Sequence, residues 1–173
     1  MAVEDTTNQL IAMLPRLRRF AVGLTGSPDE ADDLVQAACE RALSRLHQWQ
    51  PGTRLDSWMY RIIQTIWIDG GRRRAVRGEH MPLDRIAELP GSDGRDAVEA
   101  RLTLDAVRHA IGRLPEEQRV PLLLVCVEGL SYREASETLD IRMGTLMSRL
   151  HRARQRLGEL IHDRTEDLTW AND

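Results

Sequence analysis

The sequence contains no lysine, so all 24 of its basic residues are arginines. Aromatic residues make up only 4% of the chain, and stretches with the composition of β-strands are scarce. Leu, Ala, Arg and Glu dominate instead, and this composition favours helices. The longest apolar run, residues 120–127, contains Pro121 and is far shorter than the roughly 20 residues of a membrane span. We therefore predict an all-α protein that does not insert directly into a membrane.

Cysteine is also rare, since the chain has only Cys39 and Cys126, which lie far apart and each among apolar residues. Neither has a partner at the spacing of metal ligands, and the five histidines accompany no evident nucleophile. We expect two buried thiols in a reducing compartment, no metal, no cofactor and no enzymatic activity. The acidic, polar N-terminal stretch is unlike a signal peptide, which predicts a cytoplasmic location.

The net charge of −3 argues against a protein that coats DNA on its own. The charge is unevenly spread along the chain: residues 1–78 carry +2, residues 79–97 −3, residues 98–162 +1 and residues 163–173 −3. Gly and Pro are frequent in the first acidic segment. We predict two small helical domains, 1–77 and 98–162, joined by a flexible acidic linker, 78–97, and followed by a frayed acidic tail, 163–173.

The first domain is predicted to hold three helices. One covers residues 10–24, and Pro15 is predicted to kink or restart it. The second starts at Ser27, where a Ser cap precedes Pro28 and Glu30. The third covers residues 56–69. The second helix has an acidic outer face that is either solvated or a docking surface for a basic partner, and it carries Asp33, Gln36 and Glu40.

Aromatic residues and arginines cluster around the third helix. Trp49 and Tyr60 lie shortly before a run of three arginines, Arg72, Arg73 and Arg74. Such a set suits single-stranded DNA, because bases stack on rings while guanidinium groups hold the backbone. Trp58, Ile62 and Ile66 are predicted to face inward. The alternative for the whole cluster is that its aromatic rings belong to the core and that the arginines form a solvated helix end.

The most informative stretch is residues 128–157. Ser131 and Glu134 form a capping box at the start of a short helix, and Asp140 lies in the turn that ends it. A second helix has one apolar face: Leu146, Leu150, Ala153 and Leu157. Its other side carries Thr145, Ser148, Arg149, His151 and Arg152. This pattern predicts a helix-turn-helix that reads a major groove, in preference to an ordinary helical hairpin with a solvated basic face.

Four stretches in this order resemble the bacterial RNA polymerase sigma factors of the extracytoplasmic-function (ECF, group IV) type. They are DEADDLVQ at residues 29–36, RLDSWMYRI at 54–62, LPEEQR at 114–119 and GLSYREASETLDIRMGTLMSRLHRARQRL at 129–157. The resemblance covers residues 10–160 and implies a σ2-like domain followed by a σ4-like domain. It further implies binding to core RNA polymerase (its β′ clamp helices and β flap), promoter DNA and an anti-sigma factor.

The resemblance also assigns roles to residues. Core polymerase binding falls to Asp33, Gln36 and Glu40. Recognition and melting of the −10 element, with capture of a flipped base, falls to Trp49, Tyr60, Arg61, Thr65, Arg72, Arg73 and Arg74. Recognition of the −35 element falls to Arg142, Thr145, Ser148, Arg149, His151 and Arg152.

Several positions depart from the family pattern. Thr65 stands where members often have Asn, Met147 where they have a cation, and Arg142 where they have Pro. Gly70 and Gly71 replace residues that continue the helix, which predicts a looser segment for the arginine run. Two alternatives therefore stay open: a sigma-like mimic that sequesters an anti-sigma factor, and a helix-turn-helix regulator that binds DNA alone.

Overall fold

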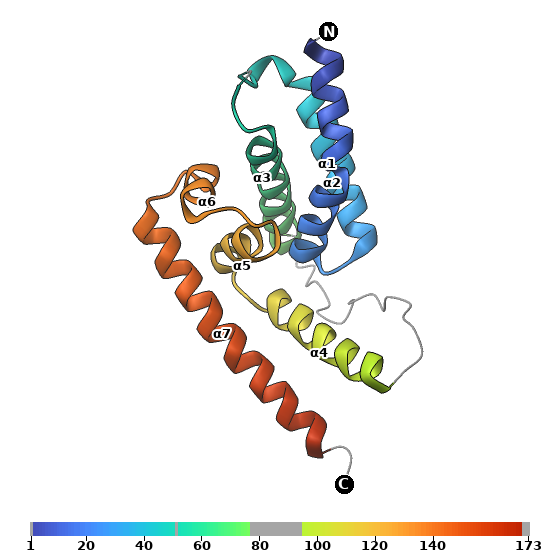
Figure 1. The fold of residues 1–173 in the computed structure, drawn as a ribbon, viewed down its shortest axis with the longest axis vertical. Coiled ribbons are helices and arrows are strands. Elements are labelled where there is room, and N and C mark those ends of the chain that lie inside the picture. Colours follow the sequence, from blue (N-terminus) through green and yellow to red (C-terminus); the bar gives the residue numbers. More distant parts are fainter. Residues whose placement is uncertain (1, 51, 77–94, 171–173) are drawn as a thin grey trace.

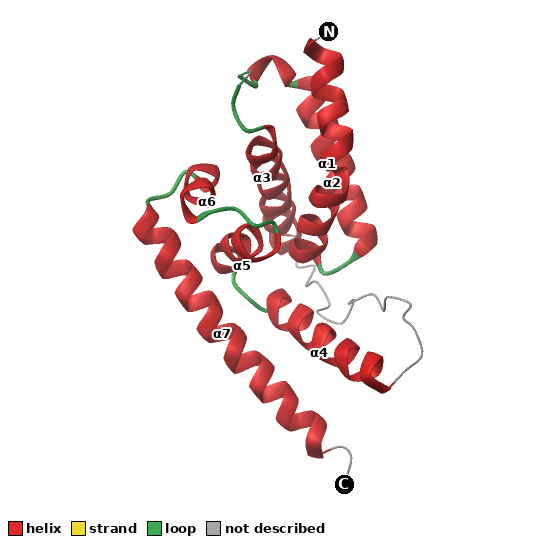
Figure 2. Cartoon of the chain, viewed as in Figure 1, coloured by secondary structure: helices red, strands yellow, loops and turns green. Residues whose placement is uncertain are grey.

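The computed structural model describes residues 2–50, 52–76 and 95–170, and within these ranges every regular element is helical (Figures 1 and 2). The elements are α1 (Ala2–Thr25), α2 (Pro28–Ser44), the 3₁₀ turn η1 (Leu46–Gln48), α3 (Leu55–Val76), α4 (Arg95–Gly112), α5 (Glu116–Leu122), the π-helical turn η2 (Leu123–Val127), α6 (Tyr132–Leu139) and α7 (Met143–Trp170). The predicted all-α class is confirmed. None of the described helices combines the length and apolar character that a membrane span requires.

The N-terminal half, residues 2–76, is a bundle of α1, α2 and α3. Gly26 ends α1 with a φ of +73°, and the Ser27 side chain caps α2 by accepting a hydrogen bond from the Glu30 backbone N–H. The predicted helix start is therefore confirmed. The expected restart at Pro15 is wrong, because α1 runs through this residue as one helix. A proline removes only one backbone donor, and buried residues on both sides, such as Leu10 and Leu17, keep the helix packed.

Helix α3 is longer than predicted. It continues through Gly70 and Gly71 and the arginine run to Val76, so the looser segment expected there is wrong. Its most buried side chains are Leu55, Met59, Tyr60 and Ile63, whereas Trp58, Ile62 and Ile66 are only partly buried. The 3.6-residue spacing of the apolar residues in α3 was compatible with either face being buried. Packing against α1 and α2 buries the face that carries Met59 and Ile63.

The C-terminal half, residues 95–170, packs α4, α5 and α6 against α7. Helix α4 begins at Arg95, inside the predicted linker, and residues 77–94 lie outside the described part of the chain. Helix α7 continues to Trp170, so most of the predicted frayed tail is helical. Cys126 is exposed and Cys39 partly buried, which corrects the expectation of two buried thiols.

The two halves pack against each other. Helix α3 contacts α6, and α1 contacts both α4 and η2; Figure 1 shows α5 and α6 beside α3. Phe20 and Ile63 of the N-terminal half share one apolar core with Leu123 and Leu130 of the C-terminal half. At Gly23 a Cβ atom would lie 2.6 Å from Leu123 Cδ2, so glycine permits this close approach. Sequence analysis predicted the two halves and missed their contact.

Candidate nucleic-acid and polymerase interfaces

The helix-turn-helix has the local geometry that its sequence predicted. Ser131 accepts a hydrogen bond from the Glu134 backbone N–H, and the Glu134 carboxylate accepts one from the Ser131 backbone N–H, which completes the capping box. Asp140 ends α6 in the left-handed conformation, with φ 52°. Leu146 and Leu150 of α7 are buried beneath the turn. These contacts fix the angle at which α7 leaves the body of the protein.

Five of the six residues assigned to the −35 element lie on α7, and the sixth, Arg142, directly precedes it. Arg142, Ser148, His151 and Arg152 are exposed, and Thr145 and Arg149 are partly buried. The Arg152 Nε–H donates a hydrogen bond to the Ser148 carbonyl oxygen at 3.3 Å. The Ser148 hydroxyl donates one to the Thr145 carbonyl oxygen at 3.0 Å.

These bonds hold the side chains along the helix, while the guanidinium of Arg152 keeps further N–H donors for a base edge or a phosphate. Arg142 lies directly before the first turn of α7, where the positive end of the helix dipole also favours a phosphate.

The residues assigned to the −10 element fall into four places, and Tyr60 lies apart from the other three. Arg61, Thr65 and Arg72, at helical spacings of four and seven, lie along one exposed stripe of α3. The Thr65 hydroxyl is held by the Arg61 carbonyl oxygen at 2.8 Å. Arg73 and Arg74 follow at the end of the same helix. Trp49, in the loop before α3, is partly buried, and its indole Nε1 is buried without a hydrogen-bond partner among the described residues.

Tyr60 is separated from the other −10 residues. It is only 1% exposed, and its ring packs edge-on against Phe20 with centroids 4.9 Å apart. Its hydroxyl donates to Glu128 Oε2 at 2.7 Å. Burial and this bond raise the pKa of Tyr60 well above its usual range. In this arrangement the ring is not accessible for stacking on a base.

The residues assigned to polymerase binding share the outer face of α2. Asp33, Gln36 and Glu40 are all exposed, and Gln36 Nε2 donates to Glu40 Oε1 at 3.1 Å. Beside them, Arg18 of α1 holds Asp32 with bonds of 2.6 and 3.1 Å, and these bonds lower the pKa of Asp32. The result is a mainly acidic surface on a rigid helix pair.

Asp33 also lines a shallow pocket of about 330 Å³ between α2 and α3, together with Arg73 and Arg74. The pocket therefore brings together one residue assigned to polymerase binding and two residues assigned to DNA binding. Sequence spacing gave no indication of this proximity, because 40 residues separate Asp33 from Arg73.

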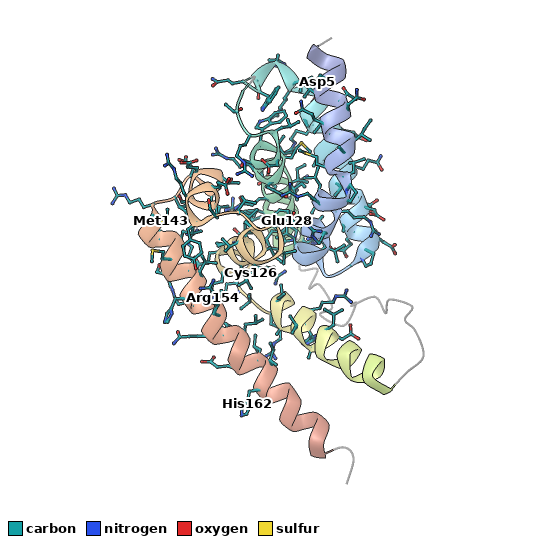
Figure 3. The ribbon with its side chains drawn as sticks, in the orientation of Figure 1. Asp5, Cys126, Glu128, Met143, Arg154 and His162 are labelled. Carbon is teal, nitrogen blue, oxygen red and sulfur yellow. The ribbon has the colours of Figure 1, made fainter. Side chains whose placement is uncertain are left out.

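Sequence analysis missed Glu128, a buried carboxylate where the halves meet (Figure 3). Its side chain is 0% exposed and lies 3.0 Å from Arg19 Nε and 3.4 Å from Arg16 Nε, both of α1, in addition to the Tyr60 hydroxyl. The hydrogen bond from Arg19 to Glu128 raises the pKa of Arg19. One feature of the sequence pointed to Glu128: it is the only charged residue between Arg119 and Arg133, within a mainly apolar stretch.

Arg119 is a second buried charge at the same junction. Its guanidinium donates to the carbonyl oxygens of Leu24 at 2.8 Å, of Leu114 at 3.0 Å and of Gly112. It also lies 5.3 Å from the centre of the Trp67 ring. Burial lowers the pKa of Arg119 to about 10, which leaves it charged at neutral pH. Arg119 thus ties the end of α1 to the end of α4 and to Trp67 within α3.

Family models match both halves of the chain. The model described as "Sigma-70, region 4" matches residues 104–157, which include the helix-turn-helix. The model described as "Sigma2 domain of PhyR" matches residues 10–64, which include α2 and the first part of α3. The order of the two domains is the one that the sequence motifs predicted.

Individual proteins agree with these matches. The ECF RNA polymerase sigma factor EcfG of Rhodopseudomonas palustris is 35% identical over 166 residues, which cover 95% of this chain and 90% of the relative. The sigma factor RpoE of Bartonella quintana, solved in complex with the anti-sigma factor NepR, superposes with a TM-score of 0.78 at 29% identity, over 92% of this chain and 98% of that one.

The anti-anti-sigma factor PhyR of Bartonella quintana, also solved with NepR, superposes with a TM-score of 0.60 over 89% of this chain and 49% of that one. At 19% identity this likeness shows the fold alone. The identity to EcfG over nearly the full length of both proteins, together with the region 4 match on the helix-turn-helix, confirms the resemblance seen in the sequence motifs: the chain belongs to the family of ECF RNA polymerase sigma factors.

Proposed function

We propose that the chain binds core RNA polymerase through the α2 face with Asp33, Gln36 and Glu40, and directs transcription from promoters with two separate elements. The outer face of α7 reads the −35 element. Arg61, Thr65 and the arginine run of α3 hold the −10 element, and Trp49 stacks on a base displaced from the duplex. The observation that carries this proposal is the pairing of an exposed, arginine-rich α7 face with a separate acidic face on α2 in one chain.

The test is run-off transcription with purified core polymerase, with and without this protein, on sheared DNA from its own genome. New, discrete start sites that share two spaced elements are the expected result. A matched pair of variants tests whether the outer face of α7 recognises the −35 element. Arg152→Ala should reduce promoter use. Arg154→Ala removes the same charge on another side of α7, beside Tyr132, and should not reduce it. Equal effects of both variants would contradict the assignment of α7.

We also propose an anti-sigma factor as a partner, because RpoE, which superposes over both halves, was solved with one. An apolar groove of about 490 Å³ between α1 and α4 suits a helix of such a partner, and Val22, Leu104 and Ile111 line it. Arg18, Arg19 and Arg108 also lie on the groove, so acidic residues beside the apolar face of the partner would be favoured.

A sigma-like mimic is the second candidate. The observation that favours it is the match of residues 10–64 to the σ2 domain of PhyR, the name also carried by an anti-anti-sigma factor of the same fold. Such a protein would bind the anti-sigma factor without supporting transcription. Binding to core polymerase without new start sites in the run-off experiment would favour this candidate over the first.

A further inference from the structure

Two methionines form an exposed apolar stripe at the start of α7 (Figure 3, where Met143 is labelled). Met143 and Met147 are 38% and 53% exposed, and among the described residues neither belongs to an apolar core. Their spacing of four residues places them on successive turns of one side of the helix. Packing within the described part of the chain therefore does not explain why these two positions are apolar.

The surroundings of the methionine stripe are cationic. Residues 141–158 contain five arginines and no Asp or Glu. Arg142 lies directly before α7, and Arg149 and Arg152 follow on the same part of the helix. A partner that covers the stripe must therefore offer negative charge at its rim and an apolar group at its centre.

The major groove of DNA has this distribution of groups. Phosphates line both edges of the groove, and each thymine presents its C5 methyl group on the floor, where apolar side chains contact it. The N-terminal residues of a recognition helix are those that reach the base edges, and Met143 and Met147 lie at the N-terminal end of α7. Methionine is unbranched and polarizable, so its side chain adapts to the irregular surface of a base step.

We infer that Met147, with Met143 beside it, recognises the C5 methyl group of a thymine in the −35 element. The inference rests on the proposed function for the identity of that element. Met147 stands where the family pattern has a cation. A cation there would attract phosphate in any DNA sequence, whereas an apolar contact is lost wherever the methyl group is missing. Met147 therefore contributes to specificity more than to general affinity for DNA.

The test compares DNA duplexes that differ only in this methyl group. Random duplexes are selected by the full-length chain bound to core polymerase and, in a second arm, by the full-length chain alone, with core polymerase alone as the blank. The sequence enriched in either arm is synthesised again with deoxyuridine in place of each thymine in turn. This exchange keeps the base pair and the O4 acceptor and removes only the C5 methyl group.

Three variants accompany the parent. Met147→Ala removes the apolar side chain, and Met147→Lys replaces it with a cation. Position 147 is exposed and both new residues favour helices, so the fold should persist, which circular dichroism checks. Ile11→Ala is the matched control, because Ile11 is exposed to a similar degree, 58%, but lies on α1 in the other half of the chain.

We expect deoxyuridine at one or two positions to lower the affinity of the parent about fourfold, which is the effect of burying one methyl group. Ile11→Ala should show the same loss. Met147→Ala should bind the unmodified duplex about fourfold more weakly than the parent and should no longer respond to the methyl group. Met147→Lys should also lose the response, and its affinity should fall more steeply with salt because it gains a phosphate contact.

Two results would overturn the thymine contact. Equal losses on deoxyuridine in the parent and in Met147→Ala would show that the methyl group acts through another residue. A Met147→Ala variant that keeps its affinity for DNA but binds core polymerase more weakly would assign the methionine stripe to a protein contact.

The two arms separate failure of this inference from failure of the proposed function. Methyl dependence through Met147 in the chain alone, without transcription from core polymerase, leaves the thymine contact standing and rejects the sigma role. Discrete transcription starts without methyl dependence reject the thymine contact and leave the sigma role intact. If neither arm enriches a sequence, α7 does not recognise DNA and both proposals are rejected.

Discussion

The outer face of α7 and the junction between the halves are both rich in arginine, yet their arginines have opposite surroundings. Arg142 and Arg152 lie in solvent, where a cation is free to meet a phosphate or a base edge. Arg119 is buried among carbonyl oxygens, and Arg19 is committed to a buried carboxylate. In a chain without lysine, the same residue type is thus an exposed cation in one region, where we propose that it contacts DNA, and a donor to buried acceptors in the other.

The largest effect is expected from Arg119→Ala at the junction. The variant leaves the carbonyl oxygens of Leu24, Gly112 and Leu114 without their charged donor, and we expect a loss of about 2–4 kcal/mol in the free energy of unfolding. Urea denaturation followed by circular dichroism measures it. Arg113→Ala, at an exposed neighbouring position, should change stability by less than about 0.5 kcal/mol. Similar losses in the two variants would show that the buried bonds are not the cause.

The close approach at the junction is tested by Gly23→Ala. The added Cβ would lie 2.6 Å from the buried Leu123 side chain, so overpacking should cost about 1–3 kcal/mol. Gly71→Ala is the matched control within another helix, because a Cβ there meets nothing within 4 Å. That variant should be neutral or more stable by up to about 1 kcal/mol. Thermal unfolding of both proteins is compared, and a Gly23→Ala protein as stable as the parent would mean that the Leu123 side chain or the packing of the halves adjusts to make room.

On the exposed side, Arg152→Ala should weaken −35-dependent transcription by about tenfold or more, because one good base contact contributes about 1–3 kcal/mol. Its affinity for core polymerase should stay within about twofold of the parent, since Arg152 lies on another half of the molecule from α2. Transcription assays with matched and mismatched −35 elements measure the first effect. Unchanged promoter use would show that the outer face of α7 does not recognise the −35 element.

Substitution of Asp33 and Gln36 by Ala should give the reverse result. Both side chains are exposed on α2, so the fold should persist while affinity for core polymerase falls by about tenfold. Binding is measured by competition against the parent for core polymerase, with a thermal scan as the control for folding. If the variant binds core polymerase as tightly as the parent but is less stable, these residues have a structural role and do not form the proposed polymerase interface.

The smallest effect concerns the exposed ion pair of Arg18 and Asp32. The hydrogen bond from Arg18 lowers the pKa of Asp32 in the folded protein, so its stabilising contribution is present above the usual carboxylate pKa and is lost as the pH falls through the folded value. Melting temperatures of the parent and Asp32→Asn should therefore converge at acidic pH and differ slightly at pH 6. An Arg18→Gln background should remove that difference at every pH.

Local sequence signals were sufficient wherever neighbouring residues decide the conformation. The Ser131 and Glu134 capping box, the turn at Asp140 and the Ser27 helix start were all predicted, because each depends on contacts within a few residues. The functional roles of the site residues stay predictions, and the structure places those of α2 and α7 on largely exposed helix faces. Tyr60 illustrates the limit, since the sequence placed it beside a possible DNA surface, and its packing against Phe20 and its hydrogen bond to Glu128 bury it.

The amino-acid sequence by itself determined the helical class, the order of the two halves and the helix-turn-helix, because composition, periodicity and capping act over short distances along the chain. The family came from the resemblance of four sequence stretches to known sigma factors. Tertiary structure alone decided which face of α3 is buried, that α1 continues through Pro15, and that Glu128 and Arg119 join the halves. Contacts such as Tyr60 with Glu128 link residues 68 positions apart. Their geometry depends on how whole helices dock, and no local pattern encodes it.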